Sequence, residues 1–380
     1  MTSLPPALLA ALEKALGPGG LLTDASDMAP FLTDWRSLFH GKACAVARPA
    51  STEACAEAVR LCAEHNVPVV PQGGNTSMVG GATPDETGLA LVIVTSRMNR
   101  VRAIDPIDNT IVVEAGVTLK AAQDAATAAG LMLPLSISSE GSAEIGGVLA
   151  TNAGGNNTVR YGNARELVLG LEAVLPDGQV LNLMRRLRKD NTGYALRQLF
   201  IGSEGTLGLI TTAILQLQPK PKSVEAALCA VADAKGALAL FSAFRNTEPS
   251  AIQAFEFMSG LSMNLVNTLI PDASLPLSEP APAYVLVELA SPREGGALRD
   301  LMEEVLGKAF EDGLVSDAVL AESETQRLAF WKLREAHADA QKRAGASVTT
   351  TFPCRPPPSR PSSTAPPPPP PHPYAQQFSP

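Results

Sequence analysis

Residues 134–163 read PLSISSEGSAEIGGVLATNAGGNNTVRYGN, with six glycines separated mostly by small and polar residues. Each glycine costs conformational entropy on folding. A segment that keeps this many is typical of a backbone that approaches a ligand closely or adopts unusual dihedral angles. The segment therefore predicts a binding surface built largely from main-chain atoms.

Two further glycine-rich segments lie on either side of it. Residues 68–82 read PVVPQGGNTSMVGGA, an apolar strand that enters a Gly-Gly turn, and residues 189–211 read KDNTGYALRQLFIGSEGTLGLIT. Successive backbone N–H groups in such a turn can point at one anion, so the segment 68–82 is typical of a diphosphate cradle and equally of a plain surface turn. Neither GxGxxG nor GxxxxGK[ST] occurs there, which argues against a Rossmann nicotinamide site and a P-loop.

The surrounding pattern is typical of a chain that mixes strands and helices. Residues 171–183 contain two apolar runs around Pro176, Asp177 and Gly178, which predicts a hairpin and an antiparallel part of a sheet. A domain boundary is expected at Pro219 to Pro221. The other expected elements are helices over 4–16, 52–65, 234–245 and 293–310 and strands near 44–48, 67–71, 255 and 284–289.

Length and composition narrow the class of protein. A chain of 380 residues with 45% hydrophobic composition can form two or three domains. Its net charge of -8 argues against nucleic acid as the main partner, and the basic cluster from Arg185 to Lys189 is interpreted as a solvated loop. No membrane span or signal peptide is expected, so we predict a cytoplasmic protein. The cysteines Cys44, Cys55, Cys62, Cys229 and Cys354 form no CxxC pair, which favours free thiols, and no metal site is predicted.

The three glycine-rich segments together resemble the FAD-binding domain of the vanillyl-alcohol oxidase and p-cresol methylhydroxylase superfamily, in its D-lactate, glycolate-subunit and D-2-hydroxyglutarate dehydrogenase branch. The matching motifs are PxGGNTxxxGG, GSxxIGGxxATNAGGxxxxRYG and KDNTGYxLxxLFIGSEGTLGxIT, in this order over residues 40–218. The resemblance implies an α+β protein: an FAD-binding domain of two α/β subdomains, an incomplete ferredoxin-like α+β cap domain and a disordered Pro-rich tail. The expected domains are residues 1–218, 222–348 and 349–380.

The resemblance also implies which residues hold FAD. Residues 73–77 would hold its pyrophosphate, Ile210 would lie against the adenosine part, and the segment from Pro134 to Asn152 would line the isoalloxazine and adenine sides. No histidine lies in residues 66–336, so the FAD is expected to be non-covalent. The implied cofactor-binding residues are Pro71, Gly73, Gly74, Asn75, Thr76, Ser77, Gly80, Gly81, Pro134, Gly141, Ser142, Ile145, Gly146, Gly147, Thr151, Asn152, Gly154, Gly205 and Ile210.

The stretch AFWKLREAHADA, residues 329–340, resembles the WxLRE helix of the family's second domain. This makes Arg334 the candidate for binding the substrate carboxylate through a bidentate, charge-assisted pair. The alternative is a surface arginine paired with a nearby glutamate. Glu256 could face the site or be simply solvated.

The family resemblance implies that the chain oxidises a D-2-hydroxy acid, of the D-2-hydroxyglutarate or D-lactate type, by hydride transfer to flavin N5 while a base takes the hydroxyl proton. Relatives supply a histidine for this purpose in an HGHxGDGNxH segment, which is missing from this sequence. The alternative function is therefore a catalytically inactive flavin-binding fragment. The electron acceptor cannot be named, and a homodimer is one possible assembly.

The last 28 residues hold 13 of the 32 prolines. The resemblance implies a continuation after Val348 as Lys-His-Asp-Val-Ser-Val-Pro or close to it, whereas this chain reads Thr349 to Arg355 as TTTFPCR. Codon degeneracy permits the family sequence in a shifted frame over these residues. We therefore expect residues from about 349 onward to be an out-of-frame continuation of a truncated chain; a genuine Pro-rich tail is the alternative.

Overall fold

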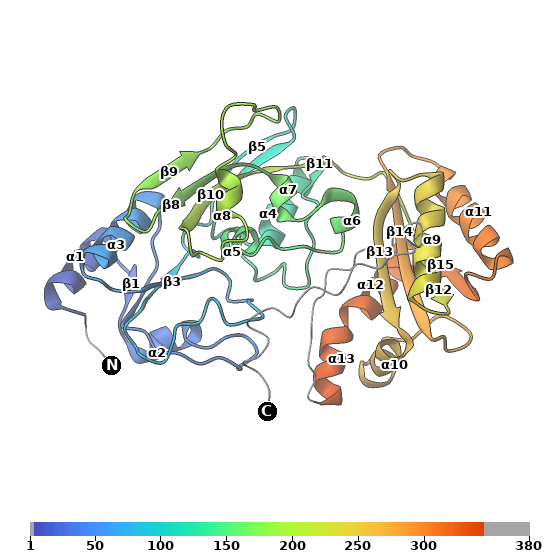
Figure 1. The fold of residues 1–380 in the computed structure, drawn as a ribbon, viewed down its shortest axis with the longest axis horizontal. Coiled ribbons are helices and arrows are strands. Elements are labelled where there is room, and N and C mark those ends of the chain that lie inside the picture. The colour runs from blue at the N-terminus through green and yellow to red at the C-terminus, as the bar shows by residue number, and fades with distance from the viewer. Residues whose placement is uncertain (1–3, 346–380) are drawn as a thin grey trace, which may run out of the picture.

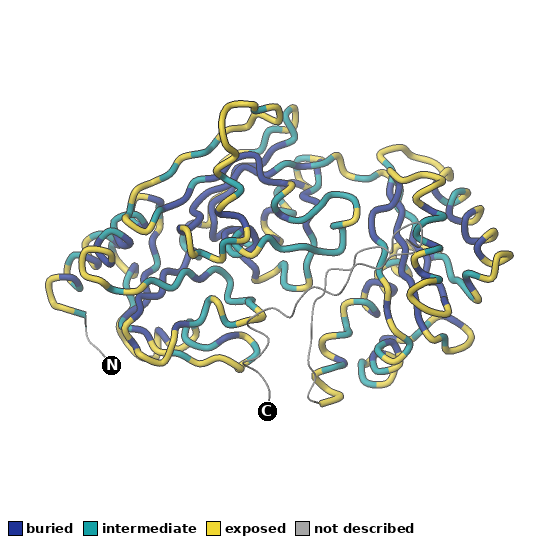
Figure 2. The backbone as a smooth tube through the Cα atoms, viewed as in Figure 1, coloured by how far each residue is buried: buried dark blue, intermediate teal, exposed yellow. Residues whose placement is uncertain are grey.

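The structure, a computed structural model, describes residues 4–345 and arranges them in two lobes (Figure 1). The N-terminal lobe, residues 4–219, contains all three glycine-rich segments, and the C-terminal lobe comprises residues 223–345. Buried residues follow the strands of both lobes, so each lobe has a core of its own (Figure 2). The stretch expected to be out of frame lies outside the described residues.

The first sheet of the N-terminal lobe is small and mixed. Strands β2, β4 and β3 are parallel, and β1 pairs antiparallel with β2. Helices α1 and α3 share a core with these strands, and Ser51 caps α3 by accepting a hydrogen bond from the Ala54 N–H. The elements are α1 Pro6–Leu16, β1 Leu21–Leu22, α2 Ala25–Met28, η1 Ala29–Phe31, β2 Ala45–Ala47, α3 Thr52–Glu64, β3 Val69–Gln72 and β4 Leu91–Val94.

The second sheet is antiparallel throughout, in the order β5-β6-β10-β8-β9. Strands β8 and β9 form the predicted hairpin, in which Gly178 takes a positive φ of 85°. The elements are β5 Val101–Asp105, β6 Thr110–Glu114, α4 Leu119–Ala128, β7 Leu131–Met132, α5 Ile145–Ala150, α6 Thr158–Tyr161, α7 Ala164–Leu167, β8 Val168–Val174, β9 Val180–Leu183, α8 Arg197–Phe200, β10 Leu209–Gln216 and β11 Gln218–Pro219.

The C-terminal lobe is built on a four-stranded antiparallel sheet in the order β13-β14-β12-β15. Residues of α9 and α11 form a core against one face, and residues of α10, α12 and α13 form a second core against the other. The elements are β12 Ser223–Val231, α9 Ala234–Thr247, β13 Ile252–Ser259, α10 Gly260–Leu269, β14 Ala283–Ser291, α11 Ala297–Glu311, β15 Asp317–Leu320, α12 Glu324–Glu335 and α13 His337–Ala344.

The C-terminal lobe has the ferredoxin-like α+β arrangement that we expected. The succession β12, α9, β13, β14, α11, β15 follows the β-α-β-β-α-β order of that fold, and apolar cores cover both faces of the sheet. The four strands that pair with one another all precede residue 321. That this domain is incomplete relative to the family stays a prediction.

Two expected helices have different bounds in the structure. The helix expected over 293–310 begins at Ala297, because Gly295 has a φ of 116°, which a right-handed helix cannot include. The single helix expected over 329–340 is divided between α12 and α13 at Ala336.

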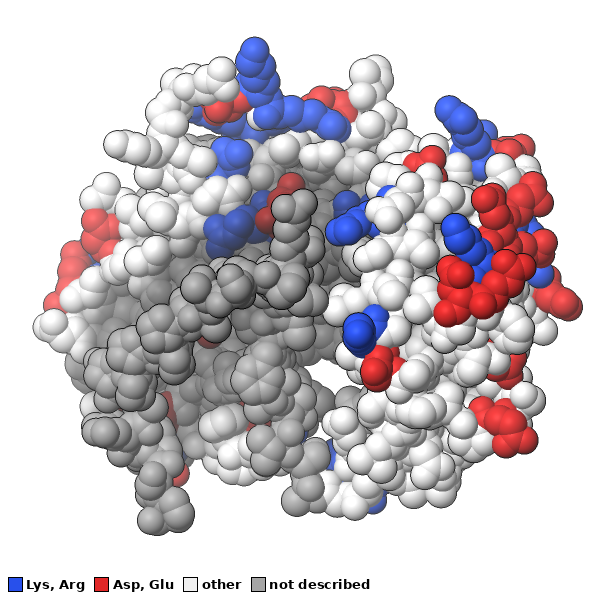
Figure 3. Space-filling model, turned by 45° about the vertical axis from the view of Figure 1, so that its right-hand side comes forward, with Lys and Arg blue, Asp and Glu red and all other residues white. Residues whose placement is uncertain are grey.

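The predicted free thiols and solvated basic loop are confirmed within the described residues. Cys55, Cys62 and Cys229 are buried and unpaired, and Cys44 is half-buried and unpaired. Arg185 forms an exposed ion pair with Asp190 in the loop that follows β9. Acidic side chains gather on the outer face of the C-terminal lobe (Figure 3), where α11 carries Asp300, Glu303, Glu304 and Glu311.

Candidate functional site

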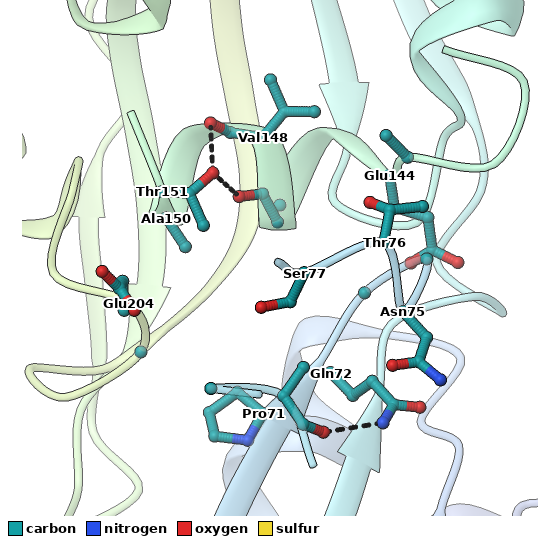
Figure 4. Close-up of a pocket in the computed structure, with 18 of the residues that line it drawn as sticks. Pro71, Gln72, Asn75, Thr76, Ser77, Glu144, Val148, Ala150, Thr151 and Glu204 are labelled. Carbon is teal, nitrogen blue, oxygen red and sulfur yellow. Dashed lines mark hydrogen bonds between the residues drawn. The ribbon is translucent and has the colours of Figure 1, made fainter. Parts of the chain in front are cut away.

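A cavity of about 400 Å³ lies within the N-terminal lobe (Figure 4). Its walls come from the end of β3 and the loop 73–82, from the residues that lead into α5 and the helix itself, and from residues 204–210 before and within β10. Each of the three glycine-rich segments therefore contributes one wall. Segments whose lining residues are more than 50 positions apart in the sequence meet at this point.

The loop 73–82 is held in place by hydrogen bonds from three side chains, of which Gln72 is buried. Gln72 Nε2 donates to the carbonyl oxygens of Ala82 (2.7 Å) and Phe31 (3.0 Å), which closes the loop at its two ends. Trp35 Nε1 donates to the Ser77 carbonyl at 3.0 Å, and Asn75 Nδ2 donates to the Thr33 carbonyl at 2.8 Å. The loop is thus shaped before any ligand binds.

Two glycines leave main-chain atoms uncovered inside the cavity. A Cβ placed on Gly73 would lie 3.4 Å from the Gly147 nitrogen, and one on Gly147 would lie 4.0 Å from the Gly73 Cα. The two backbones approach each other closely here, and both glycines present main-chain atoms to the cavity, as a diphosphate cradle requires. Gln72 Oε1 and Asn75 Oδ1 are buried at the cavity with no hydrogen-bond partner, as expected where a polar ligand completes the site.

Apolar residues and backbone dominate the rest of the lining. Among residues 4–345 no lysine, arginine or histidine lines the cavity, so main-chain N–H groups are left to meet an anion. Large apolar side chains offer surfaces for flat ring systems. They are Met78, Val79, Ile137, Val148, Leu209 and Ile210.

Most of the predicted cofactor-binding residues line this cavity, from all three segments. Those at the cavity are Pro71, Gly73, Gly74, Asn75, Thr76, Ser77, Gly81, Gly146, Gly147, Thr151, Gly205 and Ile210.

The other predicted residues are not part of the lining. The Ser142 carbonyl packs against Gly74, Ile145 is fully buried in the core, and the Pro134 carbonyl accepts a hydrogen bond from Asn157. Asn152, at a positive φ of 47°, accepts a hydrogen bond from the Arg165 N–H. The remaining three are Gly80, which packs against Phe39, Gly154, which lies near Asn163, and Gly141, which is exposed.

Glu144 is a cavity residue that the sequence did not single out. Its side chain is only 7% exposed, and its carboxylate lies beside the Thr95 hydroxyl, which comes directly after β4. Burial raises the pKa of Glu144 to about 7, against a smaller opposing effect of the Thr95 hydrogen bond. The only signal in the sequence is a carboxylate directly before IGG, which spacing alone does not distinguish from a surface residue.

Arg334 lies in the last turn of α12, in the C-terminal lobe. Its Nε donates to Glu256 Oε2 at 2.6 Å, and both side chains are partly buried. The pair predicted as the alternative is therefore present. It uses one of the five N–H donors of the guanidinium and leaves those of the two terminal nitrogens for another acceptor.

The end of α12 faces the N-terminal lobe. The pKa of Glu335 is raised by burial and by the nearby carboxylate of Glu140, which belongs to the loop before α5. A second contact joins the lobes where Arg160 Nη1 donates to the Ala290 carbonyl at 2.9 Å. Glu335, next to Arg334 in the chain, is thus near the loop before α5, whereas the side-chain contact of Arg334 itself is with Glu256.

His337 follows Arg334 by one helical turn. Its Nδ1 lies 2.8 Å from the Arg334 carbonyl, and its Nε2 is buried without a partner. Burial lowers the pKa of His337, which favours the neutral ring. Within residues 4–345 no cluster of three or more His, Cys, Asp or Glu side chains could hold a metal ion. None of the helices in that range is long and apolar enough to cross a membrane.

Two family descriptions match the chain. "FAD binding domain" matches residues 43–184, and "FAD linked oxidases, C-terminal domain" matches residues 220–360.

Curated relatives are similar over most of the chain. D-2-hydroxyglutarate dehydrogenase of Xanthomonas citri pv. viticola is 36% identical, over 87% of this chain and 69% of the relative. The mitochondrial D-2-hydroxyglutarate dehydrogenase of Bos taurus is 41% identical, over 89% of this chain and 61% of the relative. A putative mitochondrial D-lactate dehydrogenase of Schizosaccharomyces pombe is 37% identical, over 86% of this chain and 61% of the relative. The chain thus spans about three fifths of the length of the two mitochondrial relatives.

Solved structures share the fold. Alkyldihydroxyacetonephosphate synthase has a TM-score of 0.71 at 18% identity, covering 90% of this chain and 65% of that structure. p-Cresol methylhydroxylase with bound substrate has a TM-score of 0.64 at 17% identity, covering 87% of this chain and 68% of that structure.

Proposed function

Because the chain belongs to the FAD-linked oxidases of the p-cresol methylhydroxylase type, in their D-2-hydroxyglutarate and D-lactate dehydrogenase branch, we propose that it oxidises a D-2-hydroxy acid. FAD is the cofactor of this family, and the cavity fits it, with the main chain of Gly73 and Gly147 for the diphosphate and apolar walls for the rings. We further propose that FAD binds without a covalent bond, since no histidine lies in residues 66–336. The predicted cytoplasmic location stays a prediction.

The observation that carries the proposal is the cavity, whose walls are the three glycine-rich segments. We further propose that Arg334, in the last turn of α12, binds the substrate. A guanidinium there can bind the carboxylate common to all 2-hydroxy acids through its two terminal nitrogens. The ion pair to Glu256 fixes the third nitrogen, which limits the rotation of the planar group.

When bound, FAD supplies an isoalloxazine ring that accepts the hydride from the substrate. The protein's own residues would bind and orient the acid. Arg334 would hold the carboxylate, and the apolar lining would exclude water from the reacting face. A base must also take the hydroxyl proton, and the sequence contains no HGHxGDGNxH segment to provide the histidine of the relatives.

That missing segment favours a second candidate function, a flavin-binding chain that does not turn over substrate. The two candidates differ in whether a hydroxy acid can reduce the bound flavin. Both require FAD in the cavity.

The test is anaerobic reduction of the purified yellow protein. D-2-Hydroxyglutarate and D-lactate are added separately, and the absorbance of oxidised flavin is followed. Under the first candidate one of them bleaches the flavin, whereas the matching L-acid does not. In Arg334→Ala the acid concentration for half-maximal bleaching should rise about 10–100-fold while FAD stays bound, because a charge-assisted hydrogen-bonded pair contributes about 1.5–3 kcal/mol.

Lys332→Ala is the matched control, since Lys332 is an exposed cation two residues earlier on the same helix. In Lys332→Ala the acid concentration for half-maximal bleaching of the flavin should equal that of the parent. Yellow protein that neither acid reduces supports the second candidate, and colourless protein without releasable flavin contradicts both.

A further inference from the structure

The cavity that fits FAD is lined by two titratable side chains among the described residues, Glu144 and Glu204. Glu204 is exposed, whereas Glu144 is buried. In Figure 4 Glu144 lies on the side of Thr76 and Asn75, with Glu204 across the pocket. A Cβ on Gly73 would lie 3.5 Å from the Glu144 Cβ, so this acid lies directly beside Gly73 in the lining of the cavity.

The groups around Glu144 are uncharged. Gln72 on β3, Thr95 after β4 and Ser139 in the loop before α5 line the same cavity. Only burial and the Thr95 hydrogen bond affect the pKa of Glu144, so no cation acts on it. An ionised carboxylate at this place would be buried, without a counter-ion, beside the two negative charges of a diphosphate.

Thr95 gives a second reason for a neutral acid. Its Oγ1 lies between Glu144 Oε2 and the Gln72 carbonyl oxygen, which is 3.5 Å away. The hydroxyl has one hydrogen and can donate to only one of these two oxygens. If Glu144 is protonated, its O–H donates to Thr95 and Thr95 donates to Gln72, so both contacts are hydrogen bonds.

We propose that Glu144 is a neutral carboxylic acid in the FAD-binding site and that FAD binds to the protonated form of this residue. FAD binding is therefore coupled to the uptake of a proton by the protein. The proposal rests on FAD occupying the cavity, as proposed above. It makes Glu144 a cofactor-binding residue whose protonation controls retention of the flavin.

The direction of the effect follows from linkage. Burial alone raises the pKa of Glu144 to about 7, and a bound diphosphate raises it further. Below about pH 7 the acid is already protonated and FAD affinity is constant. Above it, a proton must be bound together with FAD, so the dissociation constant rises by up to about tenfold per pH unit until the pKa of the complex is reached.

The experiment is release of FAD from the flavin-loaded full-length chain. The protein is diluted at pH values from 6 to 9, and the rise of flavin fluorescence gives the dissociation constant at each pH. The dissociation constant of the parent for FAD should be constant up to about pH 7 and should rise above that pH. Glu144→Gln should keep the affinity of the parent at pH 6 across the whole range, because the amide stays neutral.

The matched control is Glu140→Gln, the same substitution four residues earlier and outside the cavity lining; it should retain the slope of the parent. The proposal is overturned if the dissociation constant of the parent does not change with pH, or if that of Glu144→Gln rises with pH as steeply as that of the parent. If Glu144→Gln does not fold, calorimetry of FAD rebinding to the parent at pH 8, in two buffers of different ionisation enthalpy, decides instead. Uptake of up to one proton per FAD supports the proposal, and no uptake overturns it. Protein that never binds FAD would contradict the proposed function itself, a result distinct from pH-independent binding.

Discussion

At the scale of single residues, two glycines of the cofactor motifs have opposite environments. A Cβ on Gly74 would lie 1.8 Å from the Ser142 carbonyl oxygen, where the loop after β3 crosses the loop before α5. A Cβ on Gly141, only one residue from Ser142, would meet nothing within 4 Å. The motif includes both glycines, but only Gly74 is required by the contact between the two walls of the cavity.

Gly74→Ala should therefore yield protein that is colourless or fails to fold, because the methyl group can be placed only if the two loops separate. Gly141→Ala should bind FAD as the parent does and change stability by no more than about 0.5 kcal/mol. The flavin content of the purified proteins and their thermal midpoints check both. A yellow, stable Gly74→Ala protein would show that the loops do not pack as described.

At the scale of secondary structure, α12 is fastened to the sheet of the C-terminal lobe by one buried carboxylate. Glu288, on β14, is 2% exposed and accepts hydrogen bonds from Arg327 (2.6 Å), Trp331 (2.7 Å) and Gln253 (2.8 Å). Arg327 and Trp331 lie one helical turn apart on the same face of α12, so both side chains can donate to Glu288. This contact sets the position of the end of the helix, which carries Arg334.

Removing the Glu288 carboxylate should lower the free energy of unfolding strongly. Glu288→Ala leaves the partly buried Arg327 and the Trp331 N–H without their acceptor, and loss of one partner of a buried pair costs about 3–5 kcal/mol. Glu324→Ala is the control, because Glu324 binds the same arginine but is 67% exposed, and such pairs contribute about 0–1 kcal/mol. Thermal unfolding followed by circular dichroism gives the midpoints of the two variants. If both substitutions lower the midpoint equally, the buried cluster does not anchor α12.

At the scale of the whole molecule, each lobe supplies a different part of the proposed site. The N-terminal lobe encloses the cavity, and the C-terminal lobe carries Arg334, the residue proposed to bind the substrate carboxylate. The lobes meet through the hydrogen bond from Arg160 to the Ala290 carbonyl and through the close approach of Glu335 to Glu140. Burial of Glu144 in the larger lobe also ties the stability of that lobe to pH.

The flavin-free protein should lose stability as pH rises from about 4.5 to 7. The pKa of Glu144 is about 7 when folded and 4.5 ordinarily, so the folded state holds the proton more tightly. The stabilisation is complete below pH 4.5 and is lost by about pH 7, an effect on the order of 3 kcal/mol. Urea unfolding gives the free energy of unfolding of the parent and of Glu144→Gln at each pH. The difference between the two free energies should change by about 3 kcal/mol between pH 4.5 and 7. A difference that does not depend on pH would contradict the raised pKa of Glu144.

The sequence by itself determined the parts of this protein that depend on local spacing. The glycine-rich turns, the hairpin around Gly178 and the helix behind Ser51 follow from residue types at short separation, because turn chemistry and helix caps act within a few residues. The motifs also indicated which segments would form the cavity. They could not separate Gly74 from Gly141.

Only the tertiary structure decided which distant side chains meet. Glu144 and Thr95 are 49 residues apart, and Arg334 and Glu256 are 78 apart. The pKa of Glu144 depends on how completely the walls around it exclude water, and the C-terminal sheet has its fourth strand because β15 pairs with β12 across the lobe. Burial and long-range pairing are properties of packed elements, and no periodicity within one segment encodes them.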